Sequence, residues 1–171
     1  VFVLPGIMGS ELAIGKQKVW LDLPGLLAGG LKKLRMDAAV RPTNLLERVY
    51  GELVEHLSGT HRVEVFPYDW RLPIDQEAKR LAAAVARTLD DPACGGLVAR
   101  TMIARHPHLW QRVTARRGSR LLMLGTPNRG SHAITQLLVG QSSTLKKLAV
   151  LDITSSQVDL LRLISRWPGV L

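Results

Sequence analysis

The sequence lacks the features that would assign the chain to a membrane or to an oxidising compartment. It contains a single cysteine, Cys94, so no disulfide can form within the chain and cysteine usage fixes no compartment. No stretch approaches the ~18 consecutive apolar residues that a membrane-spanning helix needs. The opening Val1-Phe2-Val3-Leu4 carries no basic leader of the kind that starts a signal peptide. The compartment therefore stays unassigned, with the cytoplasm as the default expectation.

Aromatic and acidic residues are also scarce. Aromatic residues make up 5% of the chain, and 14 acidic residues stand against 23 lysines and arginines, a formal net charge of +9. The aromatic residues do not interleave with the basic ones, which argues against a nucleic-acid surface that stacks bases. The positive charge fits either a solvated, arginine-rich surface or attraction to an anionic membrane surface.

Hydrophobic periodicity indicates one domain in which strands and helices alternate. A length of 171 residues is typical of a single domain. Short apolar or alternating runs indicate strands at 1–4, 62–66 and 120–124, and three- and four-residue apolar spacing indicates helices at 45–57, 78–89, 97–103 and 144–166. This order predicts an α/β fold with a parallel sheet flanked by helices. In such sheets ligands bind at the loops that leave the carboxyl ends of the strands.

Four motifs lie at such loops or at a helix start. They are a glycine-rich turn in Leu4 to Leu12, the aromatic and charged run Phe66 to Arg71, a glycine pair opening Gly95 to Arg100, and the turn Leu124 to Ser131. Two glycines in the first motif let the backbone turn sharply and expose amide N–H groups, which can stabilise an oxyanion. In the second motif, either Asp69 pairs with Arg71 while the aromatic residues pack, or the run lines a pocket.

Taken together and in this order, the motifs resemble the lecithin:cholesterol acyltransferase-like family of lipases and acyltransferases, in particular its bacterial lipase-like members. The resemblance spans nearly the whole chain. It implies an α/β-hydrolase fold, a serine–acid–histidine triad, and lipid or other carboxylic ester substrates, with no cofactor and no metal. The backbone N–H groups of Ile7 and Cys94 are the implied oxyanion donors.

The resemblance also implies where substrate would lie. Residues 21–40 correspond to a lid or membrane-facing segment within the single domain 1–171. The implied pocket and lid residues are Met8, Trp20, Tyr68, Asp69 and Trp70.

The chain departs from the family pattern at the nucleophile. Ala93 falls where the serine is expected, and Cys94 falls on the following residue. The preceding Asp90-Asp91-Pro92 is a poor strand former, so we expect the strand of the nucleophile elbow to be missing and the sheet to be incomplete. Cys94 stands just before a helix start, where a thiol is a possible substitute nucleophile; a small apolar filler is the alternative.

The remaining triad members are also without clear candidates. Only Asp152 and Asp159 follow the fourth motif as acids, and no histidine follows His132. We therefore expect ester hydrolysis or acyl transfer at the level of the family and no intact catalytic residue in this chain. Whether the chain is an enzyme stays open. The alternatives are a catalytically silent lipid- or membrane-binding module and a gene fragment.

Overall fold

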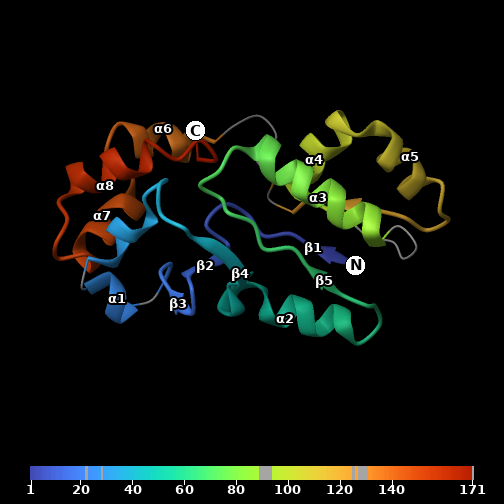
Figure 1. Ribbon diagram of the computed structural model, residues 1–171, viewed down its shortest axis with the longest axis horizontal. Coiled ribbons are helices and arrows are strands. Elements are labelled where there is room, and N and C mark those ends of the chain that lie inside the picture. Colours follow the sequence, from blue (N-terminus) through green and yellow to red (C-terminus); the bar gives the residue numbers. More distant parts are fainter. Residues whose placement is uncertain (22, 28, 89–93, 125, 127–130, 171) are drawn as a thin grey trace.

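Short strands run through the middle of the molecule and helices surround them (Figure 1). The computed structural model describes all residues of the chain except 22, 28, 89–93, 125, 127–130 and 171. The strands are β1 (Phe2–Val3), β2 (Ser10–Ile14), β3 (Gln17–Lys18), β4 (Arg41–Leu45), β5 (Glu64–Val65), β6 (Cys94–Gly95) and β7 (Leu121–Leu122).

The helices gather at two ends of the molecule. In Figure 1, α3, α4 and α5 lie together at one end, α1, α6, α7 and α8 lie at the other, and α2 runs beside the strands. Their bounds are α1 (Leu23–Leu27), α2 (Glu47–Ser58), α3 (Ile74–Thr88), α4 (Gly96–Arg105), α5 (Pro107–Thr114), α6 (His132–Leu138), α7 (Ser143–Leu151) and α8 (Gln157–Ile164). A 3-10 helix, η1 (Gly30–Leu34), packs against α8.

Two pairs of strands are parallel. β1 pairs with β5 in the register Phe2 to Glu64, and β6 pairs with β7 in the register Cys94 to Leu121. The connection from β6 to β7 consists of α4 and α5, whereas the longer one from β1 to β5 contains β2, β3 and β4 as well as α1, η1 and α2. β1 also lies beside β6, so the two pairs are neighbours. The predicted mixed α/β class with parallel strand pairing is confirmed.

The prediction of a single parallel sheet is corrected by the third group of strands. β2 pairs antiparallel with both β3 and β4, and no continuous parallel sheet joins the described strands. The cause is a tight turn between Ile14 and Gln17, where Gly15 has φ +59°. Glycine adopts this conformation without a steric penalty, so the chain reverses there into a hairpin.

The position of the expected elbow strand is described only at β6, because residues 89–93 lie outside the described part of the chain. Cys94–Gly95 forms β6, which runs directly into α4 at Gly96. Two residues are enough to pair with β7, and this pairing needs no apolar run before Cys94. β6 is nevertheless much shorter than the ~5–6 residues of an average strand.

The predicted helical tail is divided into two helices by a polar turn. The buried carboxylate of Asp152 accepts hydrogen bonds from the backbone N–H of Thr154 at 3.0 Å and from the Ser155 hydroxyl at 3.1 Å. Ser156 then caps α8 in a reciprocal arrangement with Asp159. These side chains satisfy backbone groups that would otherwise continue the helix, so they stop α7 and start α8.

Three tryptophans bring distant parts of the chain together in the core. The rings of Trp20 and Trp70 are 5.0 Å apart between centroids, and those of Trp70 and Trp167 are 5.2 Å apart, both in edge-on geometry. All three are buried. Gly169 lies against the backbone of residues 70–72, with its N–H donating to the Arg71 carbonyl at 3.0 Å. The carboxyl-terminal segment is therefore fastened to the loop that follows β5.

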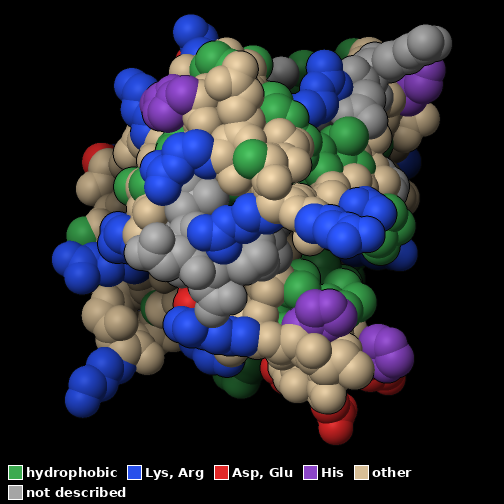
Figure 2. Space-filling model, turned by 90° about the vertical axis from the view of Figure 1, so that its right-hand side faces the viewer, with side chains coloured by type: hydrophobic (Ala, Val, Ile, Leu, Met, Phe, Trp, Pro, Cys, Tyr) green, Lys and Arg blue, Asp and Glu red, His purple; other side chains and the backbone are tan. Residues whose placement is uncertain are grey.

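The surface carries many cationic side chains. On the face at the α4–α5 end, lysine and arginine side chains are spread widely and acidic ones are few (Figure 2). Among the described residues, no helix has the length and apolar character needed to cross a membrane.

Candidate functional site

A closed turn follows β1 and contains the first motif. The Gly9 N–H donates to the Gly6 carbonyl at 3.0 Å, and Met8 has φ +61°. The Gly6 N–H donates to the Tyr50 hydroxyl of α2 at 2.8 Å. A Cβ at Gly9 would lie 2.8 Å from the Pro5 Cβ and 2.9 Å from the Gly6 carbonyl oxygen. Glycine at this position is therefore required by close packing.

Two backbone amides of this turn have no hydrogen-bond acceptor among the described residues. Within the part of the chain that the structure describes, no group accepts a hydrogen bond from the backbone N–H of Ile7 or Met8. Ile7 is 45% exposed and Met8 is partly buried against the core, so the turn lies at the edge of the core. The Met8 carbonyl accepts from the Trp20 indole N–H at 2.9 Å, which fixes the orientation of the adjoining peptide.

Ser10 joins the first motif to the second. Its hydroxyl accepts from the Tyr68 N–H at 2.9 Å, and its carbonyl accepts from the Trp70 indole N–H at 3.3 Å. All three residues are buried. The turn at Gly6–Gly9 and the Phe66–Arg71 run thus form one packed unit, although they lie far apart in the sequence.

Asp69 and Arg71 form a buried ion pair. Arg71 donates from Nε to Asp69 Oδ1 at 2.9 Å and from Nη2 to Asp69 Oδ2 at 2.7 Å, and the two side chains are only 4% and 2% exposed. Arg71 Nη1 also donates to the carbonyls of Leu34 and Arg35 at 3.1 and 2.8 Å. Asp69 therefore pairs with Arg71 as one reading of the sequence predicts, and the pair anchors the segment that contains η1.

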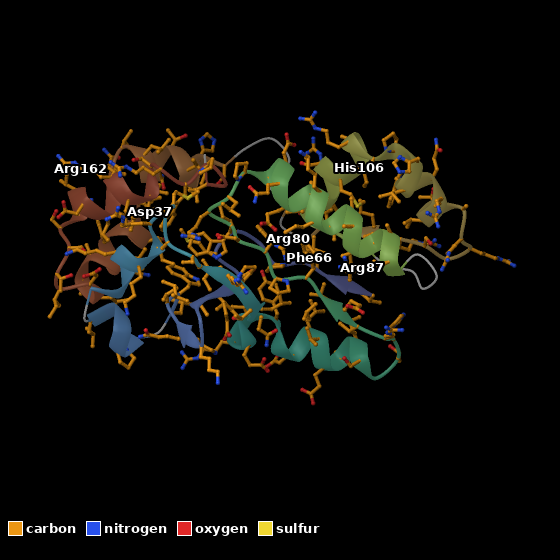
Figure 3. All side chains as sticks on the ribbon, in the orientation of Figure 1. Asp37, Phe66, Arg80, Arg87, His106 and Arg162 are labelled. Carbon is orange, nitrogen blue, oxygen red and sulfur yellow. The ribbon has the colours of Figure 1, made fainter. Side chains whose placement is uncertain are left out.

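A carboxylate from α3 approaches the same unit. Glu77 is 1% exposed and pairs with Arg80, which lies over the Phe66 ring at 5.1 Å (Figure 3). Burial raises the pKa of Glu77 above its ordinary value, and the Arg80 charge opposes this shift. Burial also raises the pKa of the Tyr68 phenol, to which Tyr50 and Glu77 contribute further.

Sequence reasoning missed the roles of Ser10, Tyr50 and Glu77. A signal was present for Glu77, because it stands four residues before Leu81 and eight before Val85 on the buried face of α3. A carboxyl group on an apolar helix face indicates a specific partner. No comparable signal marks Tyr50, since its role depends on how α2 packs beside the turn.

The segment 21–40 has both exposed and anchored parts. Leu21 and Leu27 are exposed, whereas Leu31 and Leu34 of η1 are buried. The indole N–H of Trp167 donates to the Leu34 carbonyl at 3.0 Å, so the second half of the segment is fixed to the core.

The structure describes only part of the position that the family resemblance assigns to the nucleophile. Ala93 lies outside the described residues. The backbone of Cys94 belongs to β6, but its side chain also lies outside what the structure describes. Among the described residues, no group of three or more histidine, cysteine, aspartate or glutamate side chains could hold a metal ion.

The site therefore contains two amide donors, those of Ile7 and Met8, without an acceptor among the described residues. They lie in a turn that requires glycine at position 9 and that is joined to the core by the buried contacts of Ser10. Amide donors of this kind can stabilise a carbonyl oxygen or a negatively charged oxygen. Comparison of the chain with protein-family models, curated proteins and solved structures finds no match.

Proposed function

We propose that the chain derives from an α/β-hydrolase that acts on carboxylic esters, of the lecithin:cholesterol acyltransferase-like type. In this proposal the turn at Gly6–Gly9 holds the carbonyl oxygen of an ester, and the 171-residue chain binds the acyl group without turning it over. The reaction of a complete site is attack by a serine on the ester carbonyl, formation of an acyl-enzyme, and its release to water or an alcohol.

The observation that carries the proposal is the pair of amides at Ile7 and Met8. They lie in a closed turn directly after β1, and no described group accepts from either of them. Preorganised amides of this kind stabilise the oxygen of a tetrahedral intermediate because they need no reorganisation when charge develops.

The strand–helix junction at β6 and α4 supports the same reading. In α/β-hydrolases the nucleophile stands on a sharp turn between a strand and a helix. Here β6 leads directly into α4, and β6 lies beside β1, so the junction and the turn after β1 belong to neighbouring strands. Ala93 stands at the expected nucleophile position and has no group that could attack an ester.

Residue-specific NMR tests the amide site. Butylphosphonate, whose oxygens mimic a tetrahedral intermediate, is titrated into ¹⁵N-labelled protein. We expect the amide resonances of Ile7 and Met8 to shift with a common saturation curve. Gly9→Ala should abolish the shift, because its Cβ would press on Pro5 and on the Gly6 carbonyl.

Gly6→Ala is the matched control. A Cβ at Gly6 meets only the Tyr50 hydroxyl, at the ordinary contact distance of 3.7 Å, so this variant should retain the shift. If neither amide responds in the unmodified chain, or if both alanine variants respond equally, the proposed oxyanion site is wrong.

Turnover is tested with p-nitrophenyl butyrate. We expect no hydrolysis above that of unfolded protein at equal concentration, since loss of the serine in a triad costs about 10⁶-fold in rate in subtilisin, the reference case. Hydrolysis that a serine-directed phosphonate abolishes would contradict the assignment of Ala93. Hydrolysis that iodoacetamide abolishes would instead identify Cys94 as the nucleophile.

A further inference from the structure

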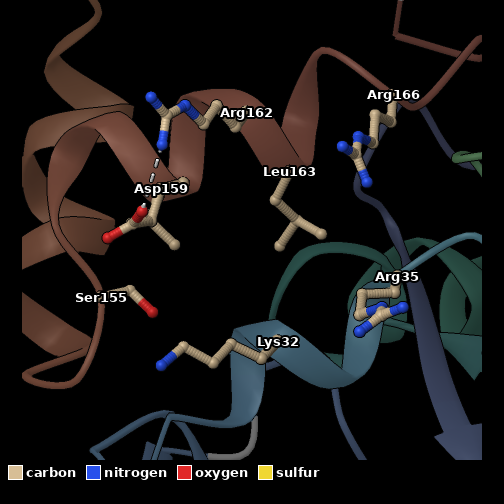
Figure 4. A pocket seen from close by; sticks show the side chains of 8 residues that line it. Lys32, Arg35, Ser155, Asp159, Arg162, Leu163 and Arg166 are labelled. Atoms are coloured by element: carbon tan, nitrogen blue, oxygen red, sulfur yellow. Dashed lines mark ion pairs between the residues drawn. The ribbon is translucent and has the colours of Figure 1, made fainter.

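A cationic hollow lies between η1 and α8, away from the turn described above. Its volume is about 260 Å³. Lys32 and Arg35 line one side, Arg162 and Arg166 line the other, and Leu163 lies between them (Figure 4). We propose that this hollow binds a phosphate group, either of a soluble phosphate ester or of a phospholipid headgroup.

The backbones that carry these cations are fixed by buried neighbours. In η1, Leu31 and Leu34 are buried on either side of the exposed Lys32. In α8, Leu160 and Ile164 are buried on either side of Arg162. The flexible cationic side chains therefore start from rigid positions that face one another across the hollow.

The hollow carries an excess of positive charge. Its four cationic groups stand against one lining carboxylate, that of Asp159. The Asp159 carboxylate accepts from the backbone N–H of Ser156 at 3.1 Å and from its hydroxyl at 2.6 Å, and lies 4.0 Å from the Arg162 guanidinium. Because it is committed to capping α8, it neutralises Arg162 only in part.

Of the other cations, Lys32 donates from Nζ to the Thr154 carbonyl at 3.1 Å, while Arg166 and Arg35 are less committed. Among the described residues, none accepts a hydrogen bond from the Arg166 guanidinium. Arg35 pairs with Asp37 at 2.7 Å, but both side chains are about two-thirds exposed, at 64% and 67%. An exposed ion pair contributes little free energy, so an incoming anion can compete with Asp37 for Arg35.

The chemistry of the lining favours phosphate over other anions. A phosphate monoester carries about −1.5 to −2 charges at neutral pH and three acceptor oxygens. Planar guanidinium groups bind such oxygens through two parallel N–H donors. Three arginines and one lysine around a single hollow can serve several oxygens at once, while Leu163 offers an apolar contact for the carbon attached to the phosphate.

The test uses the full chain and isothermal titration with glycerol 3-phosphate at low salt. Arg162→Gln and Arg166→Gln should each weaken binding about tenfold, the loss expected for one charge-assisted hydrogen bond. Arg48→Gln on α2 and Arg112→Gln on α5 also remove exposed charges, but elsewhere on the molecule, and should leave the dissociation constant within about twofold.

Asp37→Asn is expected to strengthen the binding of glycerol 3-phosphate instead of weakening it. It releases Arg35 from its carboxylate partner, so glycerol 3-phosphate should bind more tightly than it binds to the unmodified chain. Asp37 is exposed, so the fold should be unchanged, as circular dichroism can verify.

Vesicle flotation separates the two sources of phosphate. One set of vesicles contains equal parts phosphatidylglycerol and phosphatidylcholine, and the other contains phosphatidylcholine alone. Binding to the anionic set that Arg162→Gln and Arg166→Gln weaken identifies a lipid headgroup, whereas binding of glycerol 3-phosphate alone identifies a soluble ester.

The proposal is overturned if neither ligand binds, or if the control variants lose as much affinity as the hollow variants. The outcome is independent of the ester site, because the amide shifts of Ile7 and Met8 should persist in Arg166→Gln.

Discussion

Asp69→Asn removes the carboxylate that neutralises the buried guanidinium of Arg71. The variant keeps the shape of the side chain but leaves a charge that is 2% exposed without its counter-charge. Removing one partner of a buried ion pair costs about 3–5 kcal/mol. Since small domains are stabilised by only about 5–15 kcal/mol, we expect a large fraction of the free energy of unfolding to be lost.

The chain offers a control pair with matching geometry at the surface. Arg35 and Asp37 are also two residues apart and also approach to 2.7 Å, yet both side chains are mostly exposed. Asp37→Asn removes the same kind of group at the same distance from an arginine. Because water replaces the lost contact there, its effect on the free energy of unfolding should be a small fraction of that of Asp69→Asn.

Urea unfolding followed by tryptophan fluorescence measures both effects. The edge-on rings of Trp20, Trp70 and Trp167 report on the core that the buried pair borders. The double variant Asp69→Asn, Arg71→Met should recover part of the loss, because it removes the unpaired charge. Equal losses for Asp69→Asn and Asp37→Asn would refute the argument that burial makes the difference.

Three further predictions concern stability. Burial raises the pKa of Glu77 above its ordinary value of 4.5 despite the neighbouring Arg80 guanidinium, so between 4.5 and the raised pKa the folded state binds more protons than the unfolded state. The free energy of unfolding should therefore fall as pH rises through this range. The fall should be absent in Glu77→Gln. Gly169→Ala should destabilise by about 1–3 kcal/mol or more, because its Cβ would lie 2.3 Å from the Trp70 carbonyl oxygen, while Gly59→Ala, with its nearest contact at 3.5 Å, should be close to neutral in the same urea titration. Ser156→Ala should cost about 1 kcal/mol through loss of the cap of α8, measured by thermal unfolding, and a change within error would contradict the role of the cap.

The sequence predicts the elements better than their assembly. Apolar spacing correctly indicates α2, α3 and α4, because a helix repeats every 3.6 residues whatever it packs against. It does not indicate what covers each face: none of the residues of α2 is buried, and Val49 is 63% exposed. Which strands pair depends on contacts between distant residues, which periodicity does not encode.

The antiparallel sheet could have been predicted from its turn. Gly15 and Lys16 form the two-residue loop between β2 and β3, and glycine at the first position of such a loop is a hairpin signal. The pairing of Asp69 with Arg71 is one of the two readings that the sequence leaves open, and the structure confirms it. The burial of this ion pair could not be predicted in the same way. It depends on the carbonyls of Leu34 and Arg35, which accept from Arg71 and lie in a distant part of the sequence.

The junction between β6 and α4 bears on the proposal that this chain binds an acyl group without turning it over. The two residues of β6, Cys94 and Gly95, run directly into α4 at Gly96, so a strand–helix junction is present at the position where the proposal places the elbow. The residues at the junction are Ala93, Cys94, Gly95 and Gly96, and of these only Cys94 carries a group that could act as a nucleophile. Glycine and alanine carry no nucleophilic side chain. Whichever residue of the junction occupies the nucleophile position, only Cys94 could therefore attack an ester. Chemistry at this junction is therefore limited by residue type, while the amides of Ile7 and Met8 depend on backbone geometry alone and are retained without a nucleophile.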